Sequence, residues 1–122
     1  MQTILVVEDE FGEAENLVSV LAEQGYLTLV ARDGRQGLQR FHESKPDLLL
    51  VDFMMPLMNG AEMIREVRKD GARKQLPIIL MSAAHEHILK HYYDGYDAYL
   101  KKPFTNEELL SLLRKLLPPP KP

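Results

Sequence analysis

Residues suited to phosphoryl chemistry stand at the ends of four short apolar runs in this sequence. An acidic pair follows the first run, an aspartate the second, a serine the third and two lysines the fourth. In chain order these residues are Glu8, Asp9, Asp52, Ser82, Lys101 and Lys102. If the runs are parallel strands, their carboxyl ends meet at one edge of a sheet, where open α/β sheets bind ligands. The sequence therefore predicts one site at this edge.

A carboxylate in such a site can accept a phosphoryl group if a divalent cation and fixed donors neutralise the transferred oxygens. Asp52 would be the nucleophile. Glu8 and Asp9 would crowd against it, which is unfavourable unless a cation lies among the three carboxylates. Mg²⁺ is the natural candidate, since it binds one or two carboxylates together with waters and phosphate oxygens. An ammonium of Lys102 or Lys101 would bind a phosphoryl oxygen.

Each of these residues also has an ordinary structural explanation. An aspartate after a buried strand, such as Asp52, is often a cap or turn residue. The pair Glu8-Asp9 could favour a helix N-terminus through the helix dipole. Ser82, whose hydroxyl could donate to a phosphoryl oxygen, could instead cap a helix, and Lys102 could be a solvated loop charge. Coincidence would have to place all of them at one edge, so the combination favours a phosphoryl site.

Apolar runs of strand length alternate with segments of helical periodicity. Strands are expected at 4–7, 26–31, 48–52, 78–81 and 98–100. Helices are expected at 12–24, between Asp33 and Pro46, around 63–67, at 83–93 and from Thr105, which opens a Thr-x-x-Glu capping box, to Leu117. The 83–93 helix is the weakest, with few apolar positions and three histidines. Nearly solid apolar strands that alternate with helices indicate a parallel sheet covered on both faces.

The composition is that of an ordinary soluble globule. The 122 residues carry a net charge of -3, so no global basic field attracts nucleic acid or an anionic membrane, and nucleic acid is not expected as a direct partner. The absence of cysteine excludes disulfides and thiolate metal sites. No basic leader opens the sequence, and no apolar run approaches the ~20 residues that span a bilayer. A cytoplasmic location is expected.

This organisation divides the chain into two segments. Residues 1–117 are expected to form one domain. Residues 118–122 form a proline-rich tail, which is either a disordered terminus or the start of a linker to an output domain.

From about Thr3 to Leu117 the chain resembles a receiver domain of the two-component response regulators. The similarity rests on motifs that are specific in combination. They are Glu8-Asp9, Asp52 followed by Met55-Pro56 and Met58-Asn59-Gly60, Ser82-Ala83, and Tyr99-Leu100 before Lys102-Pro103-Phe104.

This resemblance implies a fold and a metal site. The fold is a single-domain, three-layer α/β/α structure of the flavodoxin-like type, with a five-stranded parallel sheet in the order 2-1-3-4-5. By similarity Asp52 is the phosphoacceptor. Mg²⁺ would be bound by Asp9, Asp52 and the backbone carbonyl of Met54, and Glu8 would assist through water.

The resemblance also assigns the phosphoryl contacts and a switch. Ser82 and Lys102 would contact the phosphoryl group, and Lys102 is selected over Lys101 because it directly precedes Pro103. A cis peptide before Pro103 is implied. On phosphorylation Ser82 would move toward the phosphoryl group, and Tyr99 would rotate inward. Tyr99 could equally be an ordinary half-buried aromatic with a solvated hydroxyl.

The leading functional hypothesis is a phosphorylation-controlled signalling switch rather than an enzyme acting on an external substrate. Its phosphoryl donor would be a histidine kinase or a histidine phosphotransfer protein, and its targets an output domain, a downstream protein or a second copy of the chain. One alternative is a receiver-like interaction module. The other is a small Mg²⁺-dependent aspartyl-phosphate hydrolase, which is disfavoured because no second acid follows Asp52.

The family motifs leave several positions of the sequence without an assigned role. His85, His87 and His91 stand where small apolar residues are more usual, and a solvated or partner-facing surface is favoured over a metal site. Phe11 is either a docking residue or packs on the first helix. A broad leucine stripe at 109–117 suggests a partner-binding face. By the same resemblance, Met54 and Ala84 would flank the path of the hydrolytic water. Neither side chain can orient a water, so self-dephosphorylation should be slow.

Overall fold

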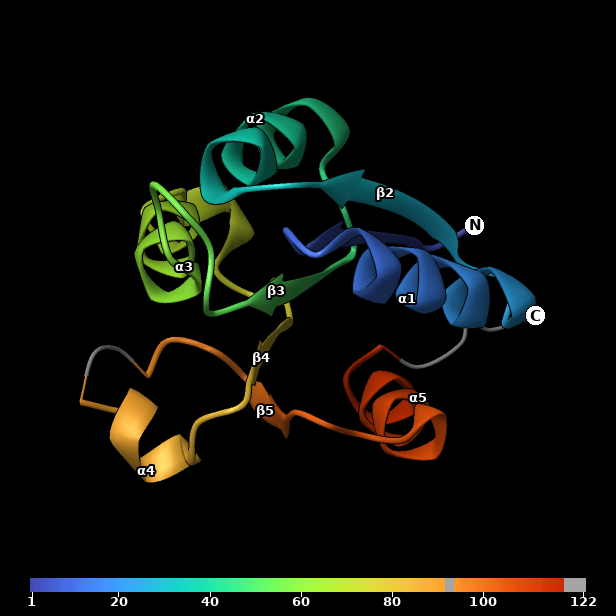
Figure 1. The fold of residues 1–122 in the computed structure, drawn as a ribbon. Coiled ribbons are helices and arrows are strands. Elements are labelled where there is room, and N and C mark those ends of the chain that lie inside the picture. The colour runs from blue at the N-terminus through green and yellow to red at the C-terminus, as the bar shows by residue number, and fades with distance from the viewer. Residues whose placement is uncertain (92–93, 118–122) are drawn as a thin grey trace.

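The computed structural model describes residues 1–91 and 94–117 and contains a parallel sheet enclosed by helices (Figure 1). The strands are β1 (Thr3–Val7), β2 (Leu27–Ala31), β3 (Leu48–Asp52), β4 (Ile78–Ser82) and β5 (Ala98–Lys101). The helices are α1 (Phe11–Glu23), α2 (Gly34–Ser44), α3 (Gly60–Arg68), the 3₁₀ turn η1 (Gly71–Arg73), α4 (Glu86–Leu89) and α5 (Asn106–Leu116). The five strands lie in the order β2-β1-β3-β4-β5, which confirms the predicted order.

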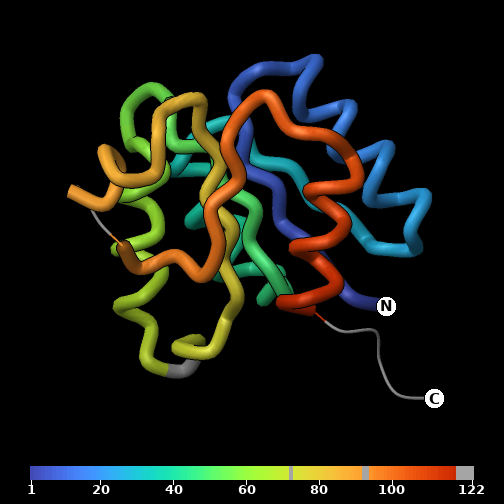
Figure 2. Tube along the Cα trace, turned by 90° about the horizontal axis from the view of Figure 1, so that it is seen from below, coloured from blue at the N-terminus to red at the C-terminus, as the bar shows by residue number. Residues whose placement is uncertain are grey.

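Helices cover both faces of the sheet: α1 and α5 lie on one side, and α2, α3 and α4 on the other (Figures 1 and 2). Successive strand residues point to opposite faces. In β1, Leu5 and Val7 join the core beneath α2, α3 and α4, while Ile4 and Val6 join the core beneath α1 and α5. All four are fully buried. Both faces must therefore be apolar, which explains the strands without polar alternation.

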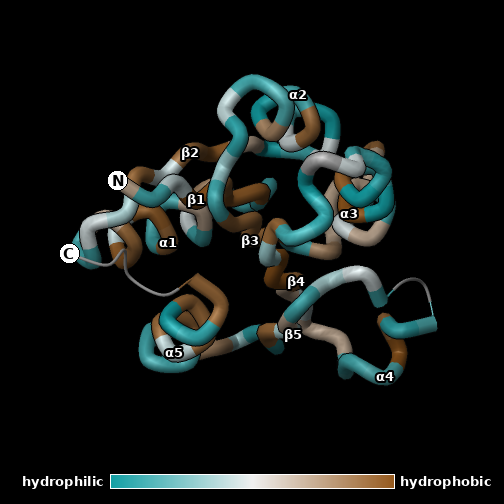
Figure 3. Tube along the Cα trace, turned by 180° about the vertical axis from the view of Figure 1, so that it is seen from behind, coloured by the Kyte–Doolittle hydropathy of each residue, from teal (hydrophilic) through white to brown (hydrophobic). Residues whose placement is uncertain are grey.

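Figure 3 shows the same fold coloured by hydropathy, with hydrophobic residues along the central strands and both hydrophobic and hydrophilic residues along the helices. No described helix has both the length and the apolar character needed to cross a membrane.

The strand register brings the polar strand ends together. Val7 of β1 pairs with Val51 of β3, so the residues that follow them emerge side by side. On the other side of β3, Ser82 of β4 pairs with Lys101 of β5. The carboxyl ends of β1, β3, β4 and β5 thus form one edge, as the sequence predicts.

The helices that border this edge begin at defined caps. The Glu10 side chain accepts hydrogen bonds from the backbone of Gly12 and Glu13 and starts α1. Asn59 and Glu62 form a capping box at the start of α3. At α5 the capping box expected at Thr105 is confirmed. Such caps satisfy N–H groups that would otherwise lack partners.

The fourth helix is shorter than predicted. A helix was expected over 83–93, but α4 spans only Glu86–Leu89, and residues 92–93 of the expected range lie outside the described part. His85 precedes α4 without a side-chain capping bond, and Leu89 is its only buried residue. A helix with one buried anchor has little tertiary packing to extend it.

The leucine stripe of α5 packs against the core beneath α1 and α5. Leu109 and Leu113 are fully buried, and the remaining leucines of the stripe pack half-buried against the same core; these are Leu110, Leu112, Leu116 and Leu117. The large apolar side chains that are exposed lie elsewhere: Met1, Phe11, Leu27, Met54, Leu57 and Ile88. The leucine stripe of α5 thus combines two buried side chains with four partly buried ones.

A close backbone approach fixes the loop after β3. The Gly60 N–H donates to the carbonyl of Phe53 at 2.9 Å. A Cβ atom on Gly60 would stand 2.6 Å from the carbonyl oxygen of Asp52. Only glycine allows α3 to begin this close to the end of β3.

Replacing Gly60 with alanine should therefore displace the loop that carries Asp52 and destabilise the fold by about 1–3 kcal/mol through overpacking. Gly71→Ala is the matched control, because a Cβ atom at Gly71 meets no neighbour within 4 Å. Chemical denaturation of both variants tests this. Equal stability of the two variants would show that the loop after β3 can move aside without a loss in the free energy of unfolding.

Candidate functional site

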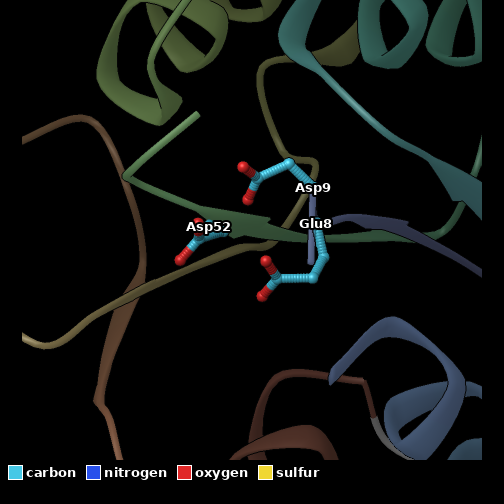
Figure 4. Close-up of side chains that lie close together, drawn as sticks. All are labelled: Glu8, Asp9 and Asp52. Atoms are coloured by element: carbon cyan, nitrogen blue, oxygen red, sulfur yellow. The ribbon is translucent and has the colours of Figure 1, made fainter. Parts of the chain in front are cut away.

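Three carboxylates gather at the carboxyl ends of β1 and β3 (Figure 4). Glu8, Asp9 and Asp52 each offer a carboxylate oxygen, and these oxygens lie within 4.8 Å of one another. Glu8 and Asp52 are only 1% and 4% exposed, whereas Asp9 is exposed. The structure thus brings together the acids that the sequence assigned to one site.

The ammonium of Lys102 lies against two of these carboxylates. Its Nζ is 2.7 Å from Glu8 Oε1 and 2.9 Å from Asp52 Oδ1. A third carboxylate, Glu13 of α1, also reaches it, with Oε2 at 3.3 Å from Nζ. The neighbouring Lys101 is exposed and forms none of these ion pairs. Geometry therefore agrees with the choice of Lys102 over Lys101.

The backbone around Lys102 ties β5 to β4. The Lys102 N–H donates to the carbonyl of Ser82 at 2.8 Å. The Lys102–Pro103 peptide bond is cis, as the family resemblance implies. Figure 2 shows the segment after β5 beside the start of α1, which is how Lys102 meets Glu13.

Burial and charge shift the acidities at this site. Burial raises the pKa of Glu8 to about 7, with the nearby Asp52 adding to the rise and the hydrogen bond from Lys102 opposing it. Burial also raises the pKa of Asp52, again against the influence of Lys102. Burial would lower the pKa of Lys102, but its bonds to Glu8 and Asp52 outweigh this and raise it. The lysine thus stays charged and compensates part of an excess of negative charge.

This donor set fits a small hard cation. Carboxylate oxygens are the ligands that Mg²⁺ prefers, and three of them converge where one ammonium cannot balance them all. Glu8, Asp9 and Asp52 form the one metal-like group of His, Cys, Asp and Glu side chains among the described residues. Met54 follows in the loop two residues after Asp52, with its side chain 68% exposed.

Ser82 and Tyr99 are linked through the loop that follows β4. Ser82 is buried, and its hydroxyl accepts a hydrogen bond from the Ala84 N–H at 3.1 Å. The Tyr99 hydroxyl bonds to the carbonyl of Ser82 at 3.1 Å and to that of Ala84. The tyrosine hydroxyl is therefore bonded to the loop carbonyls rather than only to solvent.

The remaining candidates make contacts of their own. The rings of His85 and His87 stack at 5.9 Å, and His85, His87 and His91 are all exposed. Phe11 is 57% exposed, with the Arg32 guanidinium 4.8 Å from the centre of its ring. None of these side chains contributes to the carboxylate cluster.

Sequence reasoning missed two contacts of this region. One is the ion pair from Glu13 to Lys102, and the other is the 2.9 Å hydrogen bond from the Tyr96 hydroxyl to Glu86. Glu13 carries a weak signal in the sequence, since it stands in the first turn after the acidic pair. Its partner, 89 residues away in the chain, is set by tertiary packing alone.

Comparisons with known proteins agree with this geometry. The family model described as "Response regulator receiver domain" matches residues 4–114. The DNA-binding response regulator MtrA of Mycobacterium tuberculosis is 38% identical over 118 residues, covering 95% of this chain and 50% of MtrA. The chain thus spans about half the length of this relative.

Two solved structures show the same fold. The chemotaxis response regulator CheY4 of Vibrio cholerae has a TM-score of 0.90 at 29% identity, over 96% of this chain and 99% of that one. The response regulator TrrA of Thermotoga maritima, solved in complex with Mg²⁺ and BeF, has a TM-score of 0.87 at 35% identity, over 96% of this chain and 100% of that one.

The crowded carboxylates predict that Mg²⁺ stabilises the folded protein. At about 100 times its Kd, the ion should add roughly 2–3 kcal/mol to the free energy of unfolding. Asp9→Asn should stabilise the metal-free protein by relieving repulsion and should weaken Mg²⁺ binding. Thermal melting with and without Mg²⁺ measures both effects, with the exposed Asp94→Asn as control. If Asp9→Asn and Asp94→Asn behave alike, the cluster does not bind the ion.

Proposed function

We propose that this chain, which belongs to the receiver-domain family of the response regulators, accepts a phosphoryl group on Asp52 in a Mg²⁺-dependent reaction. The observation that carries this proposal is the placement of Lys102 Nζ 2.9 Å from Asp52 Oδ1, beside the convergent carboxylates. An aspartate at the carboxyl end of a central strand is held rigidly. A fixed ammonium next to it supplies charge where phosphoryl oxygens would arrive.

The phosphoryl donor in this proposal is a phosphohistidine of a kinase or a phosphotransfer protein. An oxygen of Asp52 forms a bond to phosphorus as the bond between phosphorus and the histidine nitrogen breaks, so that no external nucleophile is needed. Lys102 and the hydroxyl of Ser82 contact the phosphoryl oxygens. The chain thereby assists its own phosphorylation, because positioning and charge stabilisation are what such a reaction requires.

The metal would be held by the carboxylates of Asp9 and Asp52 and by the backbone carbonyl of Met54, with Glu8 assisting through water. When bound, Mg²⁺ neutralises charge on the transferred oxygens. Glu8 is the most buried of the three acids, and it already has Lys102 as a counterion at 2.7 Å. This supports its assignment to an indirect role.

The signal would leave the site through Ser82. Movement of the Ser82 hydroxyl toward a phosphoryl oxygen would break its bond to the Ala84 N–H, and Tyr99 holds the carbonyls of both residues. The change would therefore reach α4, β5 and α5, where an output domain, a downstream protein or a second copy of the chain would bind. Since the donor belongs to a two-component pathway, we place the reaction in the cytoplasm.

Asp52→Asn should abolish labelling by phosphoramidate in the presence of Mg²⁺, because the amide cannot act as the nucleophile. Asp94→Asn should be labelled like the parent protein, since Asp94 lies outside the carboxylate cluster. Intact mass measurement reports the added phosphoryl group. Full labelling of Asp52→Asn at another residue would refute the assignment, and a parent protein that is never labelled would favour an interaction module.

Self-dephosphorylation should be slow, because the two residues assigned by family resemblance to the water path offer no group that orients water. Met54 is an exposed apolar side chain, and Ala84 is a half-buried methyl group. Met54→Asn should accelerate decay of the phosphorylated protein by supplying an amide beside the path. Leu57→Asn is the control, since it removes an apolar side chain that is 81% exposed from the same loop. Rapid decay in the parent, or equal decay in the two variants, would contradict this account.

A further inference from the structure

Glu13 reaches the reactive edge of the sheet from a helix that contributes no other carboxylate to Lys102. Its backbone N–H is fixed by the Glu10 cap at 2.7 Å, which sets the first turn of α1 beside Lys102. Its Oε2 lies 3.3 Å from Lys102 Nζ. The Glu13 side chain is 48% exposed, whereas that of Lys102 is only 17% exposed. Glu13 also lines, with Glu8 and Lys102, a cavity of about 420 Å³ that opens beside the site.

An exposed ion pair is usually worth little on its own. The ion pair between Glu13 and Lys102 differs from an isolated pair, because the same ammonium also contacts Glu8 and Asp52. An ammonium has three N–H donors, and Lys102 has three carboxylate partners, Glu8, Asp52 and Glu13. Hydrogen bonds to Glu8 and Glu13 and an ion pair with Asp52 therefore surround the ammonium in this state. A phosphoryl oxygen that approaches Lys102 would therefore compete with these three carboxylates for the ammonium.

The contact to Glu13 is the one most readily exchanged. It is the longest of the three, at 3.3 Å against 2.7 and 2.9 Å. Glu13 also lies outside the group of convergent carboxylates. Its exposed side chain can return to water, whereas Glu8 is buried and would lose its counterion. Breaking the bond to Glu13 therefore leaves no buried charge unpaired.

We infer that Glu13 is a positioning residue that holds Lys102 on the α1 side and is exchanged for a phosphoryl oxygen when Asp52 is phosphorylated. This inference rests on the proposed function. Glu13 thereby opposes phosphorylation because it competes with the phosphoryl group for the lysine. It acts as a brake on the phosphorylated state.

The test compares Glu13→Gln with Glu15→Gln, which removes the same charge from the same helix. Glu15 lines a separate groove beside Phe11 and Arg32. Beryllofluoride affinity is measured by calorimetry in saturating Mg²⁺, and phosphoramidate labelling rates are measured alongside. Glu13→Gln should bind beryllofluoride about three- to five-fold more tightly, the factor that corresponds to the loss of an ion pair at the upper end of the exposed range. Glu15→Gln should stay within about two-fold of the parent.

A third variant separates contact from charge. Glu13→Asp keeps the negative charge but shortens the side chain by one methylene, which takes its carboxylate out of reach of Lys102. If Glu13 acts by holding the lysine, Glu13→Asp should resemble Glu13→Gln in beryllofluoride affinity. If Glu13→Asp matches the parent protein, only the electrostatic field matters and the inference is overturned.

Separate results contradict the role of Glu13 and the phosphorylation of Asp52. A parent protein labelled on Asp52 together with unchanged or weaker beryllofluoride binding by Glu13→Gln overturns the role of Glu13 alone. The same gain in Glu15→Gln as in Glu13→Gln also overturns it. A parent protein that neither binds beryllofluoride nor becomes labelled overturns both the inference and the proposed function.

Discussion

The pairing of one ammonium with several carboxylates at the edge of a parallel sheet is the interaction on which the site depends. Parallel strands that end together necessarily bring their following residues together, and here those residues include Glu8 and Asp52. Two buried carboxylates at this distance would be costly without compensation. Lys102 offsets one of these two negative charges. The remaining charge, together with those of Asp9 and Glu13, leaves the site negative and suits it to a cation.

The fold holds this arrangement because the strands beneath it are buried on both sides. Ile4 to Val7 and Leu48 to Val51 are almost wholly inaccessible to solvent, so the ends of β1 and β3 have little freedom to separate and relax the repulsion. Gly60 brings α3 against the carbonyl of Asp52 and limits the loop above it. The segment around α4 is less restrained than the ends of β1 and β3, since this helix is short and has one buried anchor. A rigid acidic edge thus borders a segment with few restraints, as a switch requires.

The sequence predicted what depends on local pattern and on strand ends. Apolar periodicity predicted the five strands, and the Thr-x-x-Glu pattern predicted the capping box at Thr105. The polar residues at the strand ends predicted the convergence of Glu8, Asp9 and Asp52. The strand order and the cis peptide before Pro103 came from family resemblance, since no local pattern encodes them.

What the sequence did not predict depends on tertiary distances. Within the range 83–93, the described helix α4 is only four residues long and has Leu89 as its one buried anchor. The leucines of α5 proved to be half-buried or buried, because the core extends further around that helix than one stripe suggests. Glu13 became part of the site only when α1 and the segment after β5 were placed side by side.

The most direct test of the central claim is a crystal structure of the protein with Mg²⁺ and beryllofluoride. The account predicts beryllium bonded to an oxygen of Asp52, the ion held by Asp9 and Asp52, and Lys102 within hydrogen-bonding distance of a fluoride and released from Glu13. A structure in which Lys102 keeps its contacts to Glu8 and Glu13 and touches no fluoride would contradict it. Beryllofluoride bound to a residue other than Asp52 would contradict it as well.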